Sequence, residues 1–334
     1  MANQKVRTAI IGLGKMGLLH ASLLNVMKDV ELVALCDKSG LMNRLFKSAF
    51  KGTDISILND FNKLSELNLD AVYVTTPIPS HSFIVKSLYA KKIARNIFVE
   101  KTLAENYTQS KELCLAAKNV DSITMVGYMK RFNVIFEKAK ELLTQGNLGE
   151  PTSFKAYAYS SDFVELSKNS KLTASRGGAI RDIGCHVIDL AFWLLGDLEL
   201  HDVTSAVQTE KDGEPPFSFM AATSAGLTGQ FEISQRMPNY HMPEFGLTIE
   251  CQKGKIQVND DRLILTPVDA APKKWFRHDL HDNVDFSMGE AEYFRENRHF
   301  MDALLANQKC EPNFETAAKV DNFIDQLLSR SSPQ

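Results

Sequence analysis

Short apolar segments alternate with helix-like segments over the first 128 residues of the chain. Apolar runs at 6–11, 30–37, 71–75, 96–102 and 123–128 have the length of buried strands, and the stretches at 80–91 and 108–118 repeat with a helical period. Strands that are apolar on both faces and alternate with helices are typical of a parallel sheet covered on both sides. The pattern therefore predicts an α/β domain with a doubly wound parallel sheet.

The pattern changes after Tyr128. Helices are expected at 134–144, 180–195, 290–306 and 314–328, and strands at 153–161, 201–208, 217–224, 227–236, 246–252, 255–259 and 262–268. Runs of strands with few helices between them predict an α+β domain, with an open, mostly antiparallel sheet backed by helices on one face. We therefore expect two domains, 1–127 and 128–334.

Several strands of the second domain carry large apolar side chains, so its open face is expected to need a cover. A partner subunit is a candidate, which predicts a homodimer or homotetramer formed through this sheet. The apolar side chains in question are Phe217, Phe219, Met220, Phe231 and Ile233.

Composition narrows the class of protein. A length of 334 residues is enough for two domains, and a net charge of -3 gives no reason to expect a nucleic acid or an anionic membrane as partner. The five cysteines have no CxxC spacing, which is typical of a reducing compartment and predicts no zinc ribbon. Without an apolar run of secretory or membrane-spanning type, the protein is expected to be cytoplasmic.

A glycine motif follows the first strand directly and opens a helical segment. In such a motif the first glycine permits a tight turn, the second lets the backbone approach a pyrophosphate, and the third allows close packing of helix on strand. This context predicts a dinucleotide-binding Rossmann domain. The residues expected at the phosphates are Gly12, Leu13, Gly14, Lys15, Met16 and Gly17.

The ends of the later strands carry polar residues. Asp37, at the end of the second strand, is placed to accept hydrogen bonds from an adenosine ribose and would repel a 2′-phosphate, which favours NAD. Neighbouring Lys38 leaves NADP possible. Because the carboxyl ends of parallel strands form the ligand-binding edge, the other strand-end residues are expected there as well. These are Thr75, Thr76, Glu100 and Lys101.

The segment 180–196 predicts a buried helix that carries three titratable residues. Asp182, His186 and Asp189 lie at i, i+4 and i+7, on a stripe beside the apolar one. On this stretch alone, an ordinary helix shoulder, a catalytic acid/base cluster and a metal site all stay open.

Several motifs in order resemble the glucose-fructose oxidoreductase and inositol dehydrogenase family, written Gfo/Idh/MocA. They run over nearly the whole chain: AIIGLGKMG, DAVYVTTPIPSH, FVEKTLAEN, MVGYMKRFN, GNLGEP, RGGAIRDIGCHVIDLAFWLLG and EYFRENRHFMDALL. The resemblance implies that Lys101, Asp182 and His186 form the catalytic group beside the nicotinamide, at the interface of the two domains.

The resemblance also implies roles for residues around this group. Thr76, Pro77 and His81 match a loop on the cofactor side, and Arg131 matches an arginine near the active site, with Tyr128 close by. Asp189, two turns beyond Asp182, is interpreted as a structural partner rather than a catalytic one. No metal is expected.

Two positions depart from the family pattern. Thr102 stands where the family has a proline that often forms a cis peptide, which a non-proline residue adopts only at a cost of ~3 kcal/mol. The turn after Lys101 is therefore expected to be less rigid. Arg181 stands where an apolar residue is more common. It is either a solvated arginine at a helix start or a ligand for a carboxylate or phosphate of the substrate.

These residues predict an NAD(P)-dependent dehydrogenase that acts on a secondary alcohol of a sugar, an amino sugar or a cyclitol. His186 is the expected base, Asp182 orients it or holds a neighbouring hydroxyl, and Lys101 stabilises the alkoxide. Two alternatives stay open: a hydrolase or lyase that oxidises its substrate transiently with NAD, and a protein that senses NAD and a sugar without turnover.

Two further regions carry candidate residues. Substrate choice is expected to depend on the loops 159–176 and 239–243, with Tyr240 and His241 as candidate contacts. The segment RHDLHDN, 277–283, holds two histidines and two aspartates that could bind zinc, but in a polar loop such residues are more often solvated.

Overall fold

The computed structural model describes residues 5–162, 178–203, 216–282 and 291–331. Contacts divide the chain into two compact units, which we describe separately. The first comprises Met1–Tyr128 and Tyr293–Asp321, and the second comprises Met129–Glu292 and Asn322–Gln334. The chain first crosses between the units within one residue of the expected boundary. The return of residues 293–321 to the first unit differs from the expected division.

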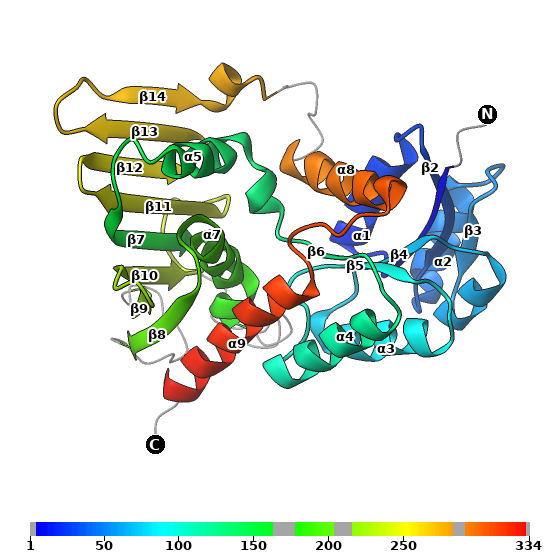
Figure 1. The fold of residues 1–334 in the computed structure, drawn as a ribbon. Helices are drawn as coiled ribbons and strands as arrows, with labels where there is room; N and C mark the ends of the chain where they lie inside the picture. Colours follow the sequence, from blue (N-terminus) through cyan, green and yellow to red (C-terminus); the bar gives the residue numbers. More distant parts are fainter. Residues whose placement is uncertain (1–4, 163–177, 204–215, 283–290, 332–334) are drawn as a thin grey trace. The chain divides into compact units, whose positions relative to one another are not determined.

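The first unit holds a six-stranded parallel sheet (Figure 1). Its strand order, β3-β2-β1-β4-β5-β6, is that of a Rossmann domain. The strands are β1 (Val6–Ile11), β2 (Val30–Cys36), β3 (Ser56–Leu58), β4 (Ala71–Val74), β5 (Asn96–Val99) and β6 (Thr124–Val126). The predicted doubly wound sheet is confirmed, and the short strand β3 at its edge was not anticipated.

Helices follow the strands of this sheet in alternation. They are α1 (Lys15–Asn25), α2 (Gly40–Ala49), α3 (His81–Ala90) and α4 (Tyr107–Asn119), with short 3-10 turns at η1 (Phe61–Glu66) and η2 (Ile78–Ser80). Because every strand runs in the same direction, the segments after β1, β2, β4 and β5 all begin at one edge of the sheet. This is the carboxyl edge, where open α/β sheets bind ligands.

Aromatic packing explains why helix α8 (Ala291–Ala306) belongs to the first unit. Tyr73 of β4 and Phe98 of β5 are register partners whose rings stack with centroids 4.5 Å apart. Phe300 of α8 contacts both rings, at 5.7 and 5.9 Å, and all three side chains are fully buried. Helix α8 therefore covers one face of β4 and β5, which alternation along the sequence does not reveal.

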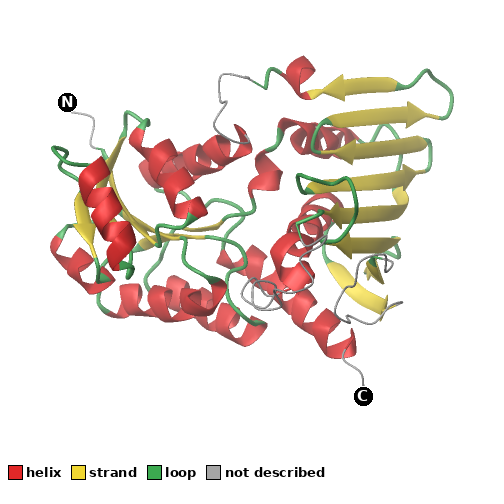
Figure 2. Ribbon diagram, turned by 180° about the vertical axis from the view of Figure 1, so that it is seen from behind, coloured by secondary structure: helices red, strands yellow, loops and turns green. Residues whose placement is uncertain are grey.

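The second unit is built on an eight-stranded sheet of order β14-β13-β12-β11-β7-β10-β9-β8. Figure 2 shows its strands in yellow. They are β7 (Pro151–Tyr159), β8 (Leu198–Val203), β9 (Phe217–Thr223), β10 (Thr228–Ser234), β11 (Glu244–Cys251), β12 (Gly254–Asn259), β13 (Arg262–Pro267) and β14 (Lys273–Phe276). Only β7 and β10 pair in parallel, so the expected mostly antiparallel sheet is confirmed.

The remaining elements connect or cover this sheet. They are η3 (Met129–Phe132), α5 (Val134–Gln145), η4 (Ile180–Gly184), α7 (Cys185–Leu195), η5 (Arg277–Leu280) and α9 (Phe314–Ser331), which begins in the first unit and ends in the second. The strand expected at 201–208 begins earlier, at Leu198, and its residues 204–208 lie outside the described part of the chain.

Most of the apolar strand residues that were expected on the open face of the sheet lie on the face covered by helices. Phe219 and Phe231 stack at 4.7 Å and both contact Phe323 of α9, so they face the helices. Phe217 and Ile233 share their side of the strands and are buried. Of the five residues, only Met220 alternates to the opposite face. The prediction was wrong for the other four, because it counted apolar residues without fixing the parity of each strand.

Candidate functional site

The glycine loop of the first unit has the geometry that a dinucleotide requires. Gly12 has a φ of +101°, and a Cβ there would lie 2.8 Å from the backbone nitrogen of Thr76. A Cβ at Gly17 would lie 1.9 Å from the oxygen of Gly12, so α1 packs directly on the loop. A Cβ at Gly14, by contrast, would meet no atom of the described residues within 4 Å, which leaves the approach to the backbone open.

Helix α1 begins at this opening with Lys15 and Met16. No side chain among the described residues caps its amino terminus, where Gly14 is the N-cap residue. The first N–H groups of a helix need acceptors, and a phosphate is a suitable one. The loop and helix start therefore fit the pyrophosphate of a dinucleotide.

Asp37 anchors the same loop. One carboxylate oxygen accepts a hydrogen bond from the N–H of Leu13 at 2.7 Å, and the other accepts one from the N–H of Ser39 at 2.7 Å. A carboxylate has about four lone-pair positions, so capacity remains for ribose hydroxyls. Lys38 is exposed beside it. Asp37 thus fixes the conformation of the loop.

The turn after β4 is tied to the glycine loop and to the turn after β5. The Thr75 hydroxyl donates to the oxygen of Gly12 at 2.7 Å. The ring nitrogens of His81 lie 2.7 Å from the oxygen of Thr76 and 2.9 Å from that of Thr102. His81 is fully buried, so its visible role is to join the two turns. Pro77, which follows Thr76 in the first of these turns, is exposed.

Glu100 and Lys101 follow β5 at the carboxyl edge. Glu100 is buried, and its carboxylate accepts a hydrogen bond from the N–H of Lys101 at 3.1 Å. Its other oxygen lies 2.8 Å from Nε2 of His20, a buried residue of α1. The peptide between Lys101 and Thr102 is cis, as the family proline often makes it. The first unit therefore gathers the strand-end residues that the sequence singled out.

The second unit presents Asp182 and His186 at the start of one helix. Residues Ile180–Gly184 form a π-type turn that leads into α7, a distortion that frequently marks functional sites. Asp182 is partly exposed and accepts a hydrogen bond from the amide of Gln235 at 2.8 Å. His186 is buried against the ring of Phe245, with centroids 5.2 Å apart. Asp182 thus has a fixed orientation.

Arg131 and Asp189 pair with each other in the interior of the second unit. The guanidinium donates two hydrogen bonds to the carboxylate, at 2.8 and 2.6 Å, and both side chains are buried. This bidentate geometry makes Asp189 a structural partner, as predicted. It also occupies the charged face of Arg131, which was expected near the substrate.

Three other candidate substrate residues lie in surroundings that argue against direct contact. Arg181 is buried and forms an ion pair with Asp325 of α9. Tyr240 packs against Tyr159, whose position on β7 alternates with the side chains that face the helices. Tyr128 is 1% exposed. Their roles as substrate ligands stay predictions.

The structure describes only part of the two remaining candidate regions, the loop 159–176 and the segment 277–283. Of the loop 159–176, residues 163–176 lie outside the described part of the chain. In the 277–282 segment, Asp282 pairs with Arg277, and Asp279 accepts a hydrogen bond from the N–H of Phe276. Within the described residues, no group of three or more histidine, cysteine or acidic side chains is placed to hold a metal ion.

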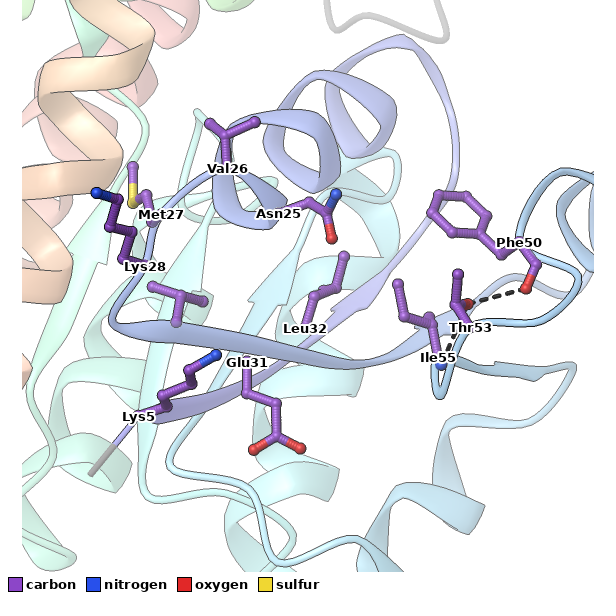
Figure 3. A pocket seen from close by; sticks show the side chains of 11 residues that line it. Lys5, Asn25, Val26, Met27, Lys28, Glu31, Leu32, Phe50, Thr53 and Ile55 are labelled. Carbon is purple, nitrogen blue, oxygen red and sulfur yellow. Dashed lines mark hydrogen bonds between the residues drawn. The ribbon is translucent and has the colours of Figure 1, made fainter. Parts of the chain in front are cut away.

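A pocket lies at the other edge of the first sheet (Figure 3). Lys5, Val30 and Ile55 stand at the starts of β1, β2 and β3, so this pocket is at the amino ends of the strands. The glycine loop and Lys101 follow the carboxyl ends. The pocket therefore has no part in the site described above.

Comparison with known proteins identifies the family. Residues 6–128 match an oxidoreductase family with an NAD-binding Rossmann fold, and residues 136–257 match the Gfo/Idh/MocA C-terminal domain. The chain belongs to the Gfo/Idh/MocA family. The resemblance drawn from the motifs is therefore confirmed, and the first unit is the NAD-binding domain of this family.

Individual Gfo/Idh/MocA relatives are named as dehydrogenases. A myo-inositol 2-dehydrogenase of Thermotoga maritima is 27% identical over 197 residues, 58% of this chain and 55% of the relative. An NAD-dependent scyllo-inositol 2-dehydrogenase of Bacillus subtilis is 30% identical over 196 residues, 58% and 54% of the two chains. The matched region spans about half the length of these curated relatives.

A solved structure shares the fold of this Gfo/Idh/MocA chain. Levoglucosan dehydrogenase in complex with NADH and levoglucosan superimposes with a TM-score of 0.82. The superposition covers 98% of this chain and 97% of the other at 20% identity.

Sequence reasoning missed three residues that support the site. His20 contacts both Asn297 and Glu100, and Gln235 donates a hydrogen bond to Asp182. His20 had a signal, because it lies in the buried stripe of α1 with Gly17, Ala21 and Leu24, where a polar residue needs a partner. Asn297 and Gln235 had none, because their partners are distant in sequence.

His81 gives a prediction for the dependence of stability on pH. Burial lowers the pKa of His81 below its ordinary 6.5, although the carbonyls of Thr76 and Thr102 act to raise it. Below about pH 6.5 the unfolded chain therefore binds a proton that the folded chain does not. The free energy of unfolding consequently decreases as the pH is lowered, by at most about 1.4 kcal/mol per pH unit. His81→Gln removes this contribution, and its unfolding midpoint should vary less between pH 7 and pH 5 in urea titrations.

A parallel variant is His299→Gln, because burial also lowers the pKa of His299. Each single variant should remove part of the acid-side loss of stability. A His81→Gln protein whose midpoint falls with acid as steeply as the parent's would contradict the assignment.

Proposed function

We propose that this protein is an NAD-dependent dehydrogenase that transfers a hydride between a secondary alcohol of a sugar, an amino sugar or a cyclitol and nicotinamide. The observation that carries the proposal is the place of Lys101. It follows β5 at the carboxyl edge of the NAD-binding sheet, two strands from the glycine loop in the order β1-β4-β5. The names of the inositol dehydrogenase relatives support the substrate class.

The cofactor would be held by the turns at this edge. The start of α1 suits the pyrophosphate and Asp37 suits the adenosine ribose. Exposed Lys38 leaves room for some use of NADP. When bound, NAD supplies nicotinamide C4 as the hydride acceptor. Thr75, Thr76, Pro77, His81, Glu100 and Lys101 complete the proposed set.

His186 is proposed as the general base. Oxidation of an alcohol needs a group that takes the hydroxyl proton, and a histidine ionises in the right range for this task. Asp182 lies one turn earlier on the same helix start, and its hydrogen bond from Gln235 fixes one carboxylate oxygen. The other oxygen is proposed to orient the imidazole or to accept a hydrogen bond from a neighbouring hydroxyl of the polyol.

Lys101 is proposed to stabilise the negative charge that develops on the alcohol oxygen. Several polar groups that converge on one substrate suit a polyol, because adjacent hydroxyls can each be fixed. Arg131 is proposed to act indirectly, since its guanidinium is bound to Asp189. Tyr128 is retained as a candidate from the family resemblance, Arg181 from its charge at the helix start, and Tyr240 from its place in the loop 239–243.

The setting proposed for the enzyme is the cytoplasm. The five cysteines are thiols that are not joined in disulfides, which suits a reducing compartment. Among the described residues, no helix has both the length and the apolar character needed to span a membrane.

Self-association through the face of the eight-stranded sheet opposite the helices is also proposed, as a homodimer or homotetramer. Met220 and Tyr157 are half-buried on this face, and Tyr159 stacks on Tyr157 with centroids 4.8 Å apart. These apolar surfaces support a protein partner there.

The activity is tested with a panel of sugars, sugar phosphates, nucleotide sugars and inositols, assayed with NAD and NADP in parallel. We expect NADH formation with at least one polyol and a drop in kcat of about 100-fold or more for His186→Gln, because a positioned base contributes this much. His201→Gln, an exposed histidine of β8, is the matched control and should keep full activity.

Other outcomes of the panel would replace this function. Consumption of a substrate without net NADH would indicate transient oxidation in a hydrolase or lyase. Binding without any product would indicate a sensor. Full turnover by His186→Gln would remove the base from the mechanism while leaving the dehydrogenase activity intact.

The oligomeric state is tested by light scattering after gel filtration. Met220→Lys places a charge on the proposed interface and should shift the protein towards the monomer. Leu305→Lys adds the same charge at an exposed position of α8 and should have no effect. A parent protein that is already monomeric at micromolar concentration would contradict the interface.

A further inference from the structure

His20 and Glu100 form a buried pair, of which the sequence assigned only Glu100 to the site. His20 is 0% exposed and lies on α1, the helix that follows the glycine loop. Its ring is surrounded by the rings of Tyr73 and Phe98, with centroids 5.5 and 5.0 Å away. Electrostatic interactions are strong in such apolar surroundings, and an uncompensated charge there is costly.

The hydrogen bonds define where the protons of this pair lie. The amide nitrogen of Asn297 donates to the oxygen of Tyr293 at 2.7 Å, so the amide oxygen faces Nδ1 of His20 at 3.0 Å. Nδ1 must therefore carry a hydrogen. Nε2 faces a carboxylate oxygen of Glu100 at 2.8 Å, and two lone pairs do not approach to that distance without a proton between them.

The imidazole and the carboxylate consequently share a proton, and His20 compensates the charge of Glu100. The second oxygen of this carboxylate accepts the N–H of Lys101 at 3.1 Å. A Cβ on Gly127 would lie 3.1 to 3.3 Å from the carboxylate atoms of Glu100, so the backbone also confines the group. The backbone of Lys101 is therefore attached to a carboxylate whose place and charge are set by His20.

We propose that His20, held by Asn297 and acting through Glu100, is a positioning residue for Lys101. The inference rests on the proposed function, in which Lys101 stabilises the alcohol oxygen. Without the imidazole, a buried carboxylate would lose its counter-charge directly beside Lys101. It would then attract the ammonium of Lys101 and compete with the substrate oxygen for it.

Three variants separate this role from simple packing. His20→Phe keeps an aromatic ring in the aromatic surroundings but removes both hydrogen bonds. His20→Gln keeps an N–H that can reach Glu100, and His20→Asn keeps a short amide on the side of Asn297. Tyr89→Phe is the control, because it removes a buried hydrogen bond of the same unit, from Tyr89 to Ser122 at 3.0 Å, away from Lys101.

The first measurement is steady-state kinetics with the polyol found by the panel, together with the Kd for NAD. We expect His20→Phe and His20→Asn to lower kcat about 10- to 100-fold, because small displacements of a catalytic group have effects of this size. His20→Gln should recover most of the loss, and Tyr89→Phe should behave as the parent. The Kd for NAD should stay within about twofold in all four, since the phosphate loop is unchanged.

The second measurement needs no substrate. Reductive methylation of the intact protein, followed by mass spectrometry of the peptide that contains Lys101, gives the reactivity of its amine. An uncompensated carboxylate favours the charged ammonium, so His20→Phe should slow methylation of Lys101 by about tenfold. Exposed Lys155 in the second unit serves as internal reference and should react at the parent rate.

The two measurements distinguish the possible failures. If the parent oxidises no polyol, the proposed function fails, and the methylation rate alone decides the role of His20. If the parent is active and the Phe, Gln and Asn variants share one kcat, or lose only NAD affinity, His20 does not position Lys101. An unchanged methylation rate of Lys101 in His20→Phe would likewise overturn the inference.

Discussion

Hydrogen bonds between the turns that follow β1, β4 and β5 are the constraint on which the first unit depends. The Thr75 hydroxyl binds the oxygen of Gly12, and the N–H of Glu100 binds the oxygen of Val74. His81 joins the oxygens of Thr76 and Thr102. Because these bonds link three strands, the glycine loop and Lys101 occupy fixed places at one edge of one sheet. Preorganisation of this kind lets binding groups act without rearrangement.

In the second unit, buried charged side chains form ion pairs with one another. Arg131 pairs with Asp189, and Lys130 lies 2.8 Å from Asp260 and 3.2 Å from Glu292. Burial acts to raise the pKa of Glu292, but Lys130 and Arg277 more than offset this and hold it below its usual value. These charges are paired with one another within the unit. Asp182 is partly exposed and accepts a hydrogen bond from the amide of Gln235.

Much of the fold followed from local patterns, because strand and helix periodicity, glycine spacing and strand ends depend on neighbours in sequence. The carboxyl-edge residues Gly12, Asp37 and Lys101 were predicted for this reason. The return of α8 to the first unit was not, because it depends on Phe300 meeting Tyr73 and Phe98 across more than two hundred residues. The roles of His20 and Gln235 are likewise set by partners that only the folded chain brings near.

The errors have the same physical origin. Phe219 and Phe231 were placed on the open face of the sheet because composition gives no strand parity, and a shift of one residue reverses it. The ion pair of Arg181 with Asp325, on a helix far along the chain, could likewise not be read from the sequence. A charged or apolar side chain in a buried segment indicates that it needs a partner, but the sequence does not identify that partner.

We propose that Lys101 of the first unit and the pair Asp182 and His186 of the second act on one alcohol of a polyol beside NAD. A crystal structure of the protein with NADH and its polyol substrate measures this most directly. We expect the nicotinamide to lie at the carboxyl edge of the first sheet, with Nζ of Lys101 and a ring nitrogen of His186 both within hydrogen-bond distance of the same substrate oxygen. A substrate bound away from either residue would contradict it.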